Sequence, residues 1–228
     1  MKIAILGAMR EEIEPILEHF GKYSEEKYAR NSFYTTKYAG HDIVLAYSKI
    51  GKVASAMSAT ILFERYGADI LLFTGVAGAL DESLKIGDII IASKCVQHDA
   101  ELEAFGHPLG FIPESDHYTL TDPVLNSLAK KVAAELDLEL LEGIIASGDQ
   151  FIAGNEKKMW IKQQFAAAAC EMEGASVGQV CAFYAKPFFL LRAISDTASG
   201  DAGVLFDEFL ESSAKIGAQF LIKMIEKI

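Results

Sequence analysis

The turns after several predicted apolar strands contain acidic residues that could carry out acid–base chemistry. Glu12 follows KIAIL, Glu173 follows an alanine run, and Asp196 follows PFFLL. Arg192 lies in the same apolar segment as Asp196. A charge buried in such a segment needs a partner of opposite charge, and we expect Glu12 and Glu173 to be the partners of Arg192. Carboxylates that share a partly dry site repel one another, so one can keep a proton near neutrality. One acid could then activate water while another protonates a leaving group.

The same residues also fit purely structural roles. Glu11 and Glu12 would complement the dipole of a helix that starts at GAMREE, and Asp196 could cap the segment after its strand. The segment EMEGAS adds Glu171, which shares a side with Glu173 only if the strand extends that far. No role is predicted for Glu171.

The glycines of TGVAGAL, at positions 75 and 78, leave two alternatives open. The segment could be a tight turn between a strand and a helix. It could also be a place where the backbone closely approaches a flat ligand, which only small residues permit. Neither the dinucleotide fingerprint G-x-G-x-x-G nor a phosphate-binding loop with its lysine is present.

The length of 228 residues predicts one domain over residues 1–228, and the composition narrows the function classes. The net charge of −11 with scattered lysines and arginines argues against nucleic-acid and membrane-surface binding. The N-terminus resembles no secretion signal. Cys95, Cys170 and Cys181 are expected to be buried and reduced in a cytoplasmic protein. Because neither Cys nor His shows ligand spacing, no metal site is predicted, and no cofactor is implied.

Short apolar runs alternate with amphipathic segments, which is typical of a largely parallel or mixed sheet covered by helices. AAAACEME, from Ala166, has a helix-forming composition but lies where a strand is needed, so we predict a strand. The other predicted strands are KIAIL, DIVLAYS, DILLFTG, GDIIIASKCVQHD, EGIIAS and KPFFLLRAIS, and the predicted helices include EEIEPILEHFG, KVASAMSATILFERYG and residues 206–228.

Nine short motifs follow one another along nearly the whole chain: IxGAMxEE, SxIGKVxA, TGxAGxL, GDIIIA, HDAELEAFG, SGDQFI, EMEGAS, RAISDTAS and FDEFL. Taken together and in this order, they resemble the family of 5′-methylthioadenosine/S-adenosylhomocysteine nucleosidases. The segments GAMREEIEPIL, VQHD and AFGHPLGFIPES look like the branch found in Helicobacter and Campylobacter, whose members also act on 6-amino-6-deoxyfutalosine.

The resemblance implies a fold, a reaction and a set of residue roles. The fold would be a three-layer α/β/α sandwich around a central mixed sheet, as in nucleoside phosphorylases. The reaction would be hydrolysis of the bond between adenine N9 and ribose C1′ through an oxocarbenium-like transition state. Asp196 would bind the N7/N6 edge of adenine and help to protonate it, and Glu12 would activate water. Glu173 would hold the ribose hydroxyls, with Met172 packed against the sugar.

The resemblance also implies further substrate-binding residues and a homodimer. Arg192 would orient the water and the carboxylates, Phe151 would stack on the purine, and the Ile152 backbone would bind its edge. The remaining implied residues are Val76, Ala77, Gly78 and Ser195 around the base and the water, Met9, Ile50 and Phe206 in an apolar 5′ pocket, and Leu102, Phe105 and Pro113 lent by a second subunit.

Three positions depart from the family pattern. Val76 stands where many members have Ser, His107 where Tyr is common, and Gly174 where Ala is usual. The first two could affect water positioning and the preference for a 5′ group, which the sequence leaves open. The alternatives are a purine nucleoside phosphorylase on the same fold, an adenosine-binding protein without catalysis, and a non-catalytic dinucleotide-binding domain.

Overall fold

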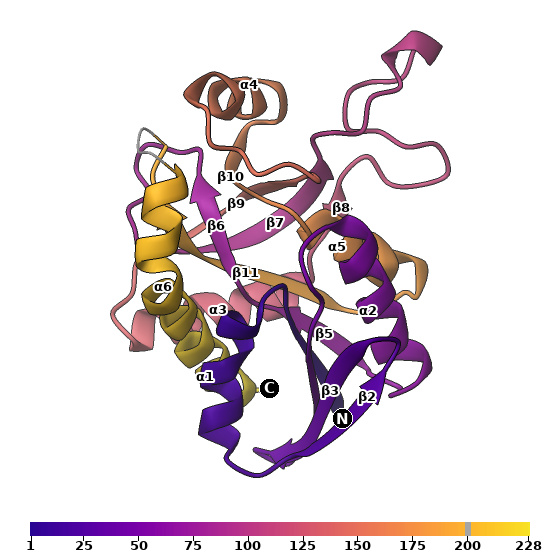
Figure 1. The fold of residues 1–228 in the computed structure, drawn as a ribbon, viewed down its shortest axis with the longest axis vertical. Helices are drawn as coiled ribbons and strands as arrows, with labels where there is room; N and C mark the ends of the chain where they lie inside the picture. The colour runs from indigo at the N-terminus through magenta and orange to yellow at the C-terminus, as the bar shows by residue number, and fades with distance from the viewer. Residues whose placement is uncertain (199–201) are drawn as a thin grey trace.

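The computed structural model describes residues 1–198 and 202–228, without the side chains of residues 202–208. Its strands and helices alternate along most of the chain (Figure 1). The strands are β1 (Lys2–Gly7), β2 (Ser24–Tyr28), β3 (Asn31–Tyr38), β4 (His41–Tyr47), β5 (Ile70–Phe73), β6 (Val76–Ala79), β7 (Ile89–Gln97), β8 (Thr119–Leu120), β9 (Leu140–Ser147), β10 (Ala167–Glu171) and β11 (Phe188–Asp196). The helices are α1 (Arg10–Phe20), α2 (Lys52–Glu64), the 3₁₀ helix η1 (Glu103–Phe105), α3 (Pro123–Glu135), α4 (Asn155–Phe165), α5 (Gly174–Phe183) and α6 (Ala202–Ile225).

The strands form one mixed sheet in the order β2-β3-β4-β1-β5-β11-β6-β10-β9-β7-β8. The β1, β4, β5 and β11 strands pair in parallel, whereas β10 with β6 and β11 with β7 are antiparallel. Because β11 pairs with both β6 and β7, the strands β11, β6, β10, β9 and β7 close on themselves. The long β11 strand therefore joins the open part of the sheet to its curled part.

Side chains of β1 alternate between the two faces of the sheet, as a strand buried on both sides must. Ile3 and Ile5 pack with apolar residues of α1, α3 and α6. Ala4 and Leu6 pack in a second core with apolar residues of α2 and α5. Figure 1 shows α1 and α6 on one side of the sheet and α2 and α5 on the other. The predicted three-layer α/β/α sandwich with a mixed central sheet is confirmed.

Most predicted elements are present, with two corrections. The alanine-rich segment is the β10 strand, as predicted, because its burial between β6 and β9 outweighs the helix preference of alanine. The turn-to-helix alternative for TGVAGAL is wrong, since Val76–Ala79 forms β6. The β2–β3 hairpin was not predicted, and its β2 residues, SEEKY, are all exposed and show no apolar pattern. No helix in the described residues is long and apolar enough to cross a membrane.

Candidate active site

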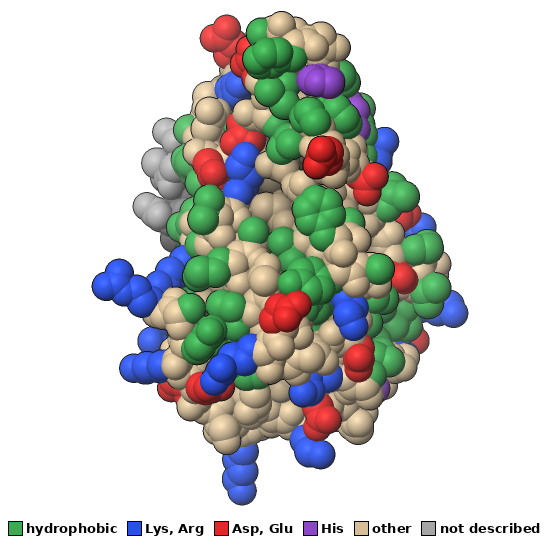
Figure 2. Space-filling model, turned by 90° about the vertical axis from the view of Figure 1, so that its right-hand side faces the viewer, with side chains coloured by type: hydrophobic (Ala, Val, Ile, Leu, Met, Phe, Trp, Pro, Cys, Tyr) green, Lys and Arg blue, Asp and Glu red, His purple; other side chains and the backbone are tan. Residues whose placement is uncertain are grey.

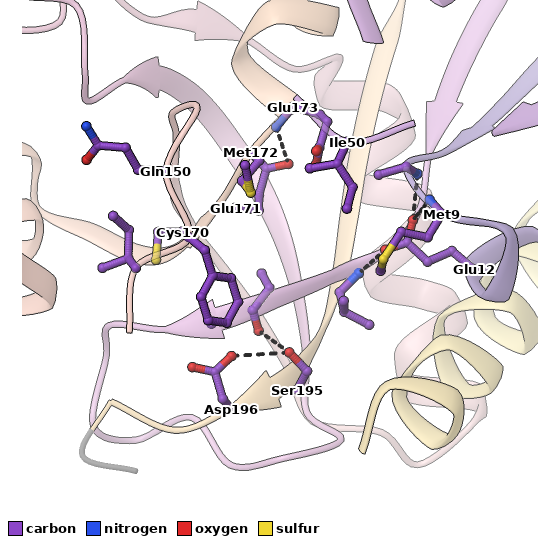
Figure 3. A pocket seen from close by; sticks show the side chains of 16 residues that line it. Met9, Glu12, Ile50, Gln150, Cys170, Glu171, Met172, Glu173, Ser195 and Asp196 are labelled. Atoms are coloured by element: carbon purple, nitrogen blue, oxygen red, sulfur yellow. Dashed lines mark hydrogen bonds between the residues drawn. The ribbon is translucent and has the colours of Figure 1, made fainter. Parts of the chain in front are cut away.

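A cavity of about 340 Å³ lies where β1, β6, β10 and β11 end or begin. Figure 3 shows Glu12 and Met9 at one end, Asp196 and Ser195 at another, and Glu171, Met172 and Glu173 along a third side. The predicted residues that line it are Met9, Glu12, Ile50, Val76, Ala77, Gly78, Phe151, Ile152, Met172, Glu173, Ser195 and Asp196, together with four that were not predicted, Ala8, Gln150, Cys170 and Glu171. Mostly apolar walls with a few converging acids are typical of a ligand pocket.

Glu12 is fixed by backbone donors in the first turn of α1. One carboxylate oxygen, Oε2, accepts hydrogen bonds from the amides of Ala8 at 2.5 Å and Met9 at 3.0 Å. The other oxygen, Oε1, accepts one from the Val76 amide at 2.9 Å. A Cβ atom at Gly75 would lie 2.6 Å from Oε1, so glycine leaves room for this carboxylate. The expected helix-start role is therefore present, but the carboxylate also reaches the cavity.

Burial makes the Glu12 carboxylate a stronger base than an exposed one, and so a better acceptor for a water proton. Its side chain is almost completely buried, and desolvation raises the pKa of the carboxyl above its usual value, although the charge of Arg192 and the backbone amides act in the opposite direction. A carboxylate with a raised pKa is a stronger base than an exposed one. The Val76 side chain brings no hydroxyl to this end of the cavity, but its amide helps to hold the base.

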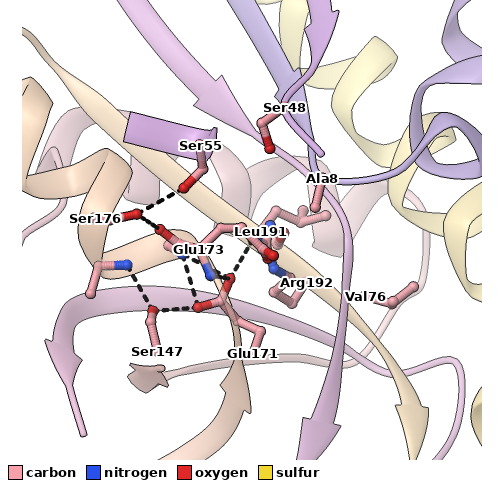
Figure 4. Close-up of polar contacts among 12 residues, drawn as sticks. Ala8, Ser48, Ser55, Val76, Ser147, Glu171, Glu173, Ser176, Leu191 and Arg192 are labelled. Atoms are coloured by element: carbon pink, nitrogen blue, oxygen red, sulfur yellow. Dashed lines mark hydrogen bonds and ion pairs between the residues drawn. The ribbon is translucent and has the colours of Figure 1, made fainter. Parts of the chain in front are cut away.

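Arg192 is neutralised by Glu171, the acid to which no role was assigned (Figure 4). Its Nη2 lies 2.6 Å from Glu171 Oε2, both side chains are buried, and the guanidinium packs over the Phe73 ring. This corrects the expectation that Glu12 and Glu173 would pair with Arg192, since they act on it only through their charges. Arg192 is not among the described residues that line the cavity, and it acts on the site through its pairing with Glu171 and through its charge.

Glu171 also fixes the start of α5. Its two oxygens accept hydrogen bonds from the Gly174 amide at 2.9 and 2.8 Å, and its Oε1 accepts one from the Ser147 hydroxyl. A Cβ atom at Gly174 would lie 2.5 Å from Leu190 Cδ2 and 3.1 Å from Glu171 Oε1. The strand ends at Glu171, whereas Glu173 is the residue that precedes α5. The two acids therefore occupy different elements.

Glu173 is a buried carboxyl that accepts the Gly51 amide at 2.8 Å and lines the cavity. Burial, followed by the charge of Glu171, raises the pKa of Glu173 to about 8, while Arg192 opposes the shift. The folded chain thus binds more protons at this position than the unfolded chain between the usual value of 4.5 and about 8. Ligand hydroxyls that contact Glu173 would add donors to the Gly51 amide, from which it already accepts a hydrogen bond.

Folding stability is expected to decrease as the pH rises toward 8, because the raised pKa of Glu173 favours its protonated form in the folded state. In Glu173→Gln the fall in Tm between about pH 6 and about pH 8.5 should be smaller than in the wild type. Glu142→Gln is the control, because Lys130 lowers the pKa of Glu142. Parallel curves of Tm against pH for wild type and Glu173→Gln would contradict the assignment.

Asp196 has a partner that the sequence analysis missed. Its Oδ2 lies 2.9 Å from Lys158 Nζ, and its Oδ1 accepts a hydrogen bond from the Ser195 hydroxyl at 3.2 Å. A Cβ atom at Gly78 would lie 2.9 Å from Oδ2, so Gly78 makes room for this acid as Gly75 does for Glu12. Lys158 could have been found from the buried face of α4, where it stands at helical spacing with Ile161 and Phe165.

The residues predicted to reach the site from a second subunit lie outside this cavity. Phe105 on η1 is 78% exposed, Pro113 is exposed and Leu102 is half-buried. Their placement in a partner's site remains a prediction. Phe206 lies in α6, but its side chain is outside the described residues. Among the described residues, no group of three or more His, Cys, Asp or Glu side chains could hold a metal ion.

Comparison with known proteins places this geometry in a family. The model of the phosphorylase superfamily matches residues 2–227. The chain belongs to this superfamily. Within the superfamily, it is 54% identical to an aminodeoxyfutalosine nucleosidase of Campylobacter jejuni, with full coverage of both chains. It is 37% identical to a 5′-methylthioadenosine/S-adenosylhomocysteine nucleosidase of Actinobacillus succinogenes, again over both full lengths.

Solved structures of superfamily members agree with the sequence comparison. A Helicobacter pylori 5′-methylthioadenosine/S-adenosylhomocysteine nucleosidase in complex with a substituted pyrrolidin-3-ol is 50% identical, with a TM-score of 0.98 and coverage of 100% of this chain and 99% of the other. The nucleosidase from Campylobacter jejuni has a TM-score of 0.96 at 54% identity, with both chains covered completely. The resemblance inferred from the sequence motifs is confirmed.

Proposed function

We propose that this member of the phosphorylase superfamily is an N-glycosyl hydrolase. It would cleave the bond between N9 and C1′ of 5′-substituted adenosines and release adenine and the 5′-substituted ribose. The observation that carries the proposal is the placement of two buried acids, Glu12 and Asp196, at different ends of one apolar cavity. The names of the relatives support the same substrate class: 5′-methylthioadenosine, S-adenosylhomocysteine and aminodeoxyfutalosine.

In the proposed mechanism each acid acts on a different part of the nucleoside. Asp196 binds the N7/N6 edge of adenine and delivers a proton to N7 as the glycosidic bond breaks. Glu173 accepts hydrogen bonds from the ribose hydroxyls, and Met172 packs against the sugar. Glu12 removes a proton from the water that attacks C1′, where positive charge develops. Phe151, which is half exposed, and Ile152 cover the purine.

The cavity favours hydrolysis over phosphorolysis. A phosphorylase needs cations and free amides to hold phosphate. Of the described residues that line this cavity, none is Lys or Arg, and Arg192 is already paired with Glu171. The amides near the proposed water position, those of Ala8, Met9 and Val76, are occupied by the Glu12 carboxylate. A negatively charged base at this place would repel phosphate.

We further propose that the chain, as one domain, forms a homodimer in the cytoplasm. Apolar side chains are exposed on α2, on α5 and just before α2. Exposed apolar patches of this kind are typical of protein interfaces. Figure 2 shows hydrophobic side chains gathered on the side of the molecule where α2 and α5 lie. The exposed fractions are 82% for Val53, 44% for Met57, 67% for Phe183 and 56% for Ile50. Three free, buried cysteines fit a reducing compartment.

The proposed reaction predicts that the chain releases adenine from 5′-methylthioadenosine in buffer free of phosphate. Adding phosphate should not increase the rate, because water is the nucleophile. The kcat/KM values for S-adenosylhomocysteine and aminodeoxyfutalosine, measured in the same assay, would rank the 5′ groups. A requirement for phosphate, with a ribose 1-phosphate as product, would instead identify a phosphorylase.

A further inference from the structure

Asp196 is held by a buried lysine from a different element. Lys158 on α4 is 2% exposed, and its Nζ lies 2.9 Å from Asp196 Oδ2 and 2.7 Å from the carbonyl oxygen of Thr197. Asp196 is the last residue of β11 and Thr197 follows it. The lysine therefore connects α4 to the end of the strand that carries the acid. Lys158 is not among the described residues that line the cavity, and it reaches the site through Asp196.

A buried ion pair of this kind is a costly way to stabilise a fold. Removing two charges from water costs several kcal/mol for each ion, and apolar side chains of similar volume often stabilise equally well. The neighbouring positions of the same helix face, Ile161 and Phe165, are apolar. The position of Lys158 therefore calls for a role that an apolar side chain could not fill. Its ammonium group can both donate hydrogen bonds and release a proton, whereas an arginine cannot be deprotonated.

Given the proposed nucleosidase reaction, we propose that Lys158 supplies the proton that Asp196 passes to the leaving adenine. In the ion pair, the ammonium of Lys158 carries this proton and Asp196 is the carboxylate that accepts the hydrogen bond. As the N9–C1′ bond breaks, its electron pair moves into the purine and makes N7 more basic. The Nζ–H bond then breaks as an Oδ2–H bond forms, and the Oδ2–H bond breaks as N7–H forms.

This transfer leaves all charges accounted for. Asp196 ends as a carboxylate again, Lys158 as a neutral amine, and adenine as a neutral leaving group. Glu12 meanwhile accepts the proton of the water that forms the C1′–O bond. After the products leave, Glu12 releases its proton to the solvent and Lys158 regains one, so the starting carboxylate and the ion pair are both restored. Lys158 thus acts through Asp196, as a positioning and proton-supplying residue that does not contact the substrate.

Two substitutions separate proton supply from simple positioning. Lys158→Arg keeps the positive charge and the hydrogen bond to Asp196 but cannot release a proton. Lys158→Met keeps most of the apolar volume and removes the charge. Lys157→Met is the matched control, because the neighbouring Lys157 packs over the Trp160 ring. All variants are first compared by Tm, so that a loss of folded protein is recognised.

Each variant is assayed with two substrates that differ in their leaving group. One is 5′-methylthioadenosine, and the other is the 4-nitrophenyl 5-methylthioriboside, whose nitrophenolate departs without a proton. Both Lys158 variants should lose about 10²-fold or more in kcat with the adenine nucleoside. With the nitrophenyl riboside their kcat should stay within a factor of about three of the wild type. Lys157→Met should match the wild type with both substrates.

Several outcomes would overturn the proposal. Full activity of Lys158→Arg on 5′-methylthioadenosine would show that the charge alone suffices. An equal loss with both substrates would assign Lys158 a structural role, and no loss in either variant would remove it from the reaction. Failure of the proposed function looks different, because the wild-type chain itself would then release no adenine from 5′-methylthioadenosine.

Discussion

Glu12→Gln is expected to lower kcat/KM for 5′-methylthioadenosine by about 10²- to 10⁴-fold, the usual contribution of a general base. Glutamine has nearly the same shape as glutamate but cannot accept the proton of the attacking water. In addition, both carboxylate oxygens accept hydrogen bonds from backbone amides. The amide nitrogen of glutamine would therefore face a donor, and the side chain would lose one of these contacts. Steady-state kinetics with 5′-methylthioadenosine measures the loss.

Glu11→Gln is the matched control for this experiment. Glu11 also lies in the first turn of α1, but its side chain is exposed and does not line the cavity. If the acids only complement the helix dipole, the two substitutions should cost similar, small amounts of stability and leave turnover unchanged. If Glu12 is the base, only Glu12→Gln should lose activity while its Tm shows that it remains folded. Near-normal turnover of Glu12→Gln would refute the assigned role.

Arg192→Met is expected to cost the fold about 3–5 kcal/mol in free energy of unfolding, because it leaves Glu171 as an uncompensated buried charge. Arg192 Nη2 lies 2.6 Å from Glu171 Oε2, and both side chains are almost fully buried. The loss should also raise the electrostatic cost of ionising Glu12 and Glu173, since the Arg192 charge lowers the pKa of both. Equilibrium unfolding in urea measures the change in free energy.

The double variant Arg192→Met with Glu171→Gln tests the cause of this loss. Glutamine keeps an acceptor oxygen for the Gly174 amide and carries no charge. The double variant should therefore be more stable than Arg192→Met alone, even though it contains one more substitution. If the two substitutions instead add their costs, the uncompensated charge is not the source of the destabilisation, and the packing of Arg192 against Phe73 is the better explanation.

The parts of the fold that could be predicted are those with a continuous or periodic apolar pattern. The β1 strand and α1 were recognised because KIAIL is continuously apolar and its helix has a clear start and a glycine end. Alanines 167–169 were placed in a strand by their context rather than by their composition. The β2–β3 hairpin and β6 were missed, since an all-exposed SEEKY and a glycine-containing VAGA carry no such pattern.

The cavity acids could be predicted, but which cation pairs with which acid could not. Glu12, Glu173 and Asp196 each follow an apolar strand, so their convergence at one sheet edge follows from the α/β pattern and the family motifs. The pairing of Arg192 with Glu171 depends on the exact position at which β10 ends and α5 begins, because only two residues separate these elements. The pairing of Asp196 with Lys158 spans 38 residues and joins different elements. Such contacts are set by the packed fold rather than by local sequence.

The proposed reaction requires that water is the nucleophile that attacks C1′. The most direct measurement is mass spectrometry of the sugar formed from 5′-methylthioadenosine in water enriched in oxygen-18, early in the reaction and with phosphate present. Attack by water predicts one labelled oxygen at C1 of a free 5-methylthioribose and no sugar phosphate, with formation of this product strongly reduced in Glu12→Gln. An unlabelled 5-methylthioribose 1-phosphate as the first product would contradict it.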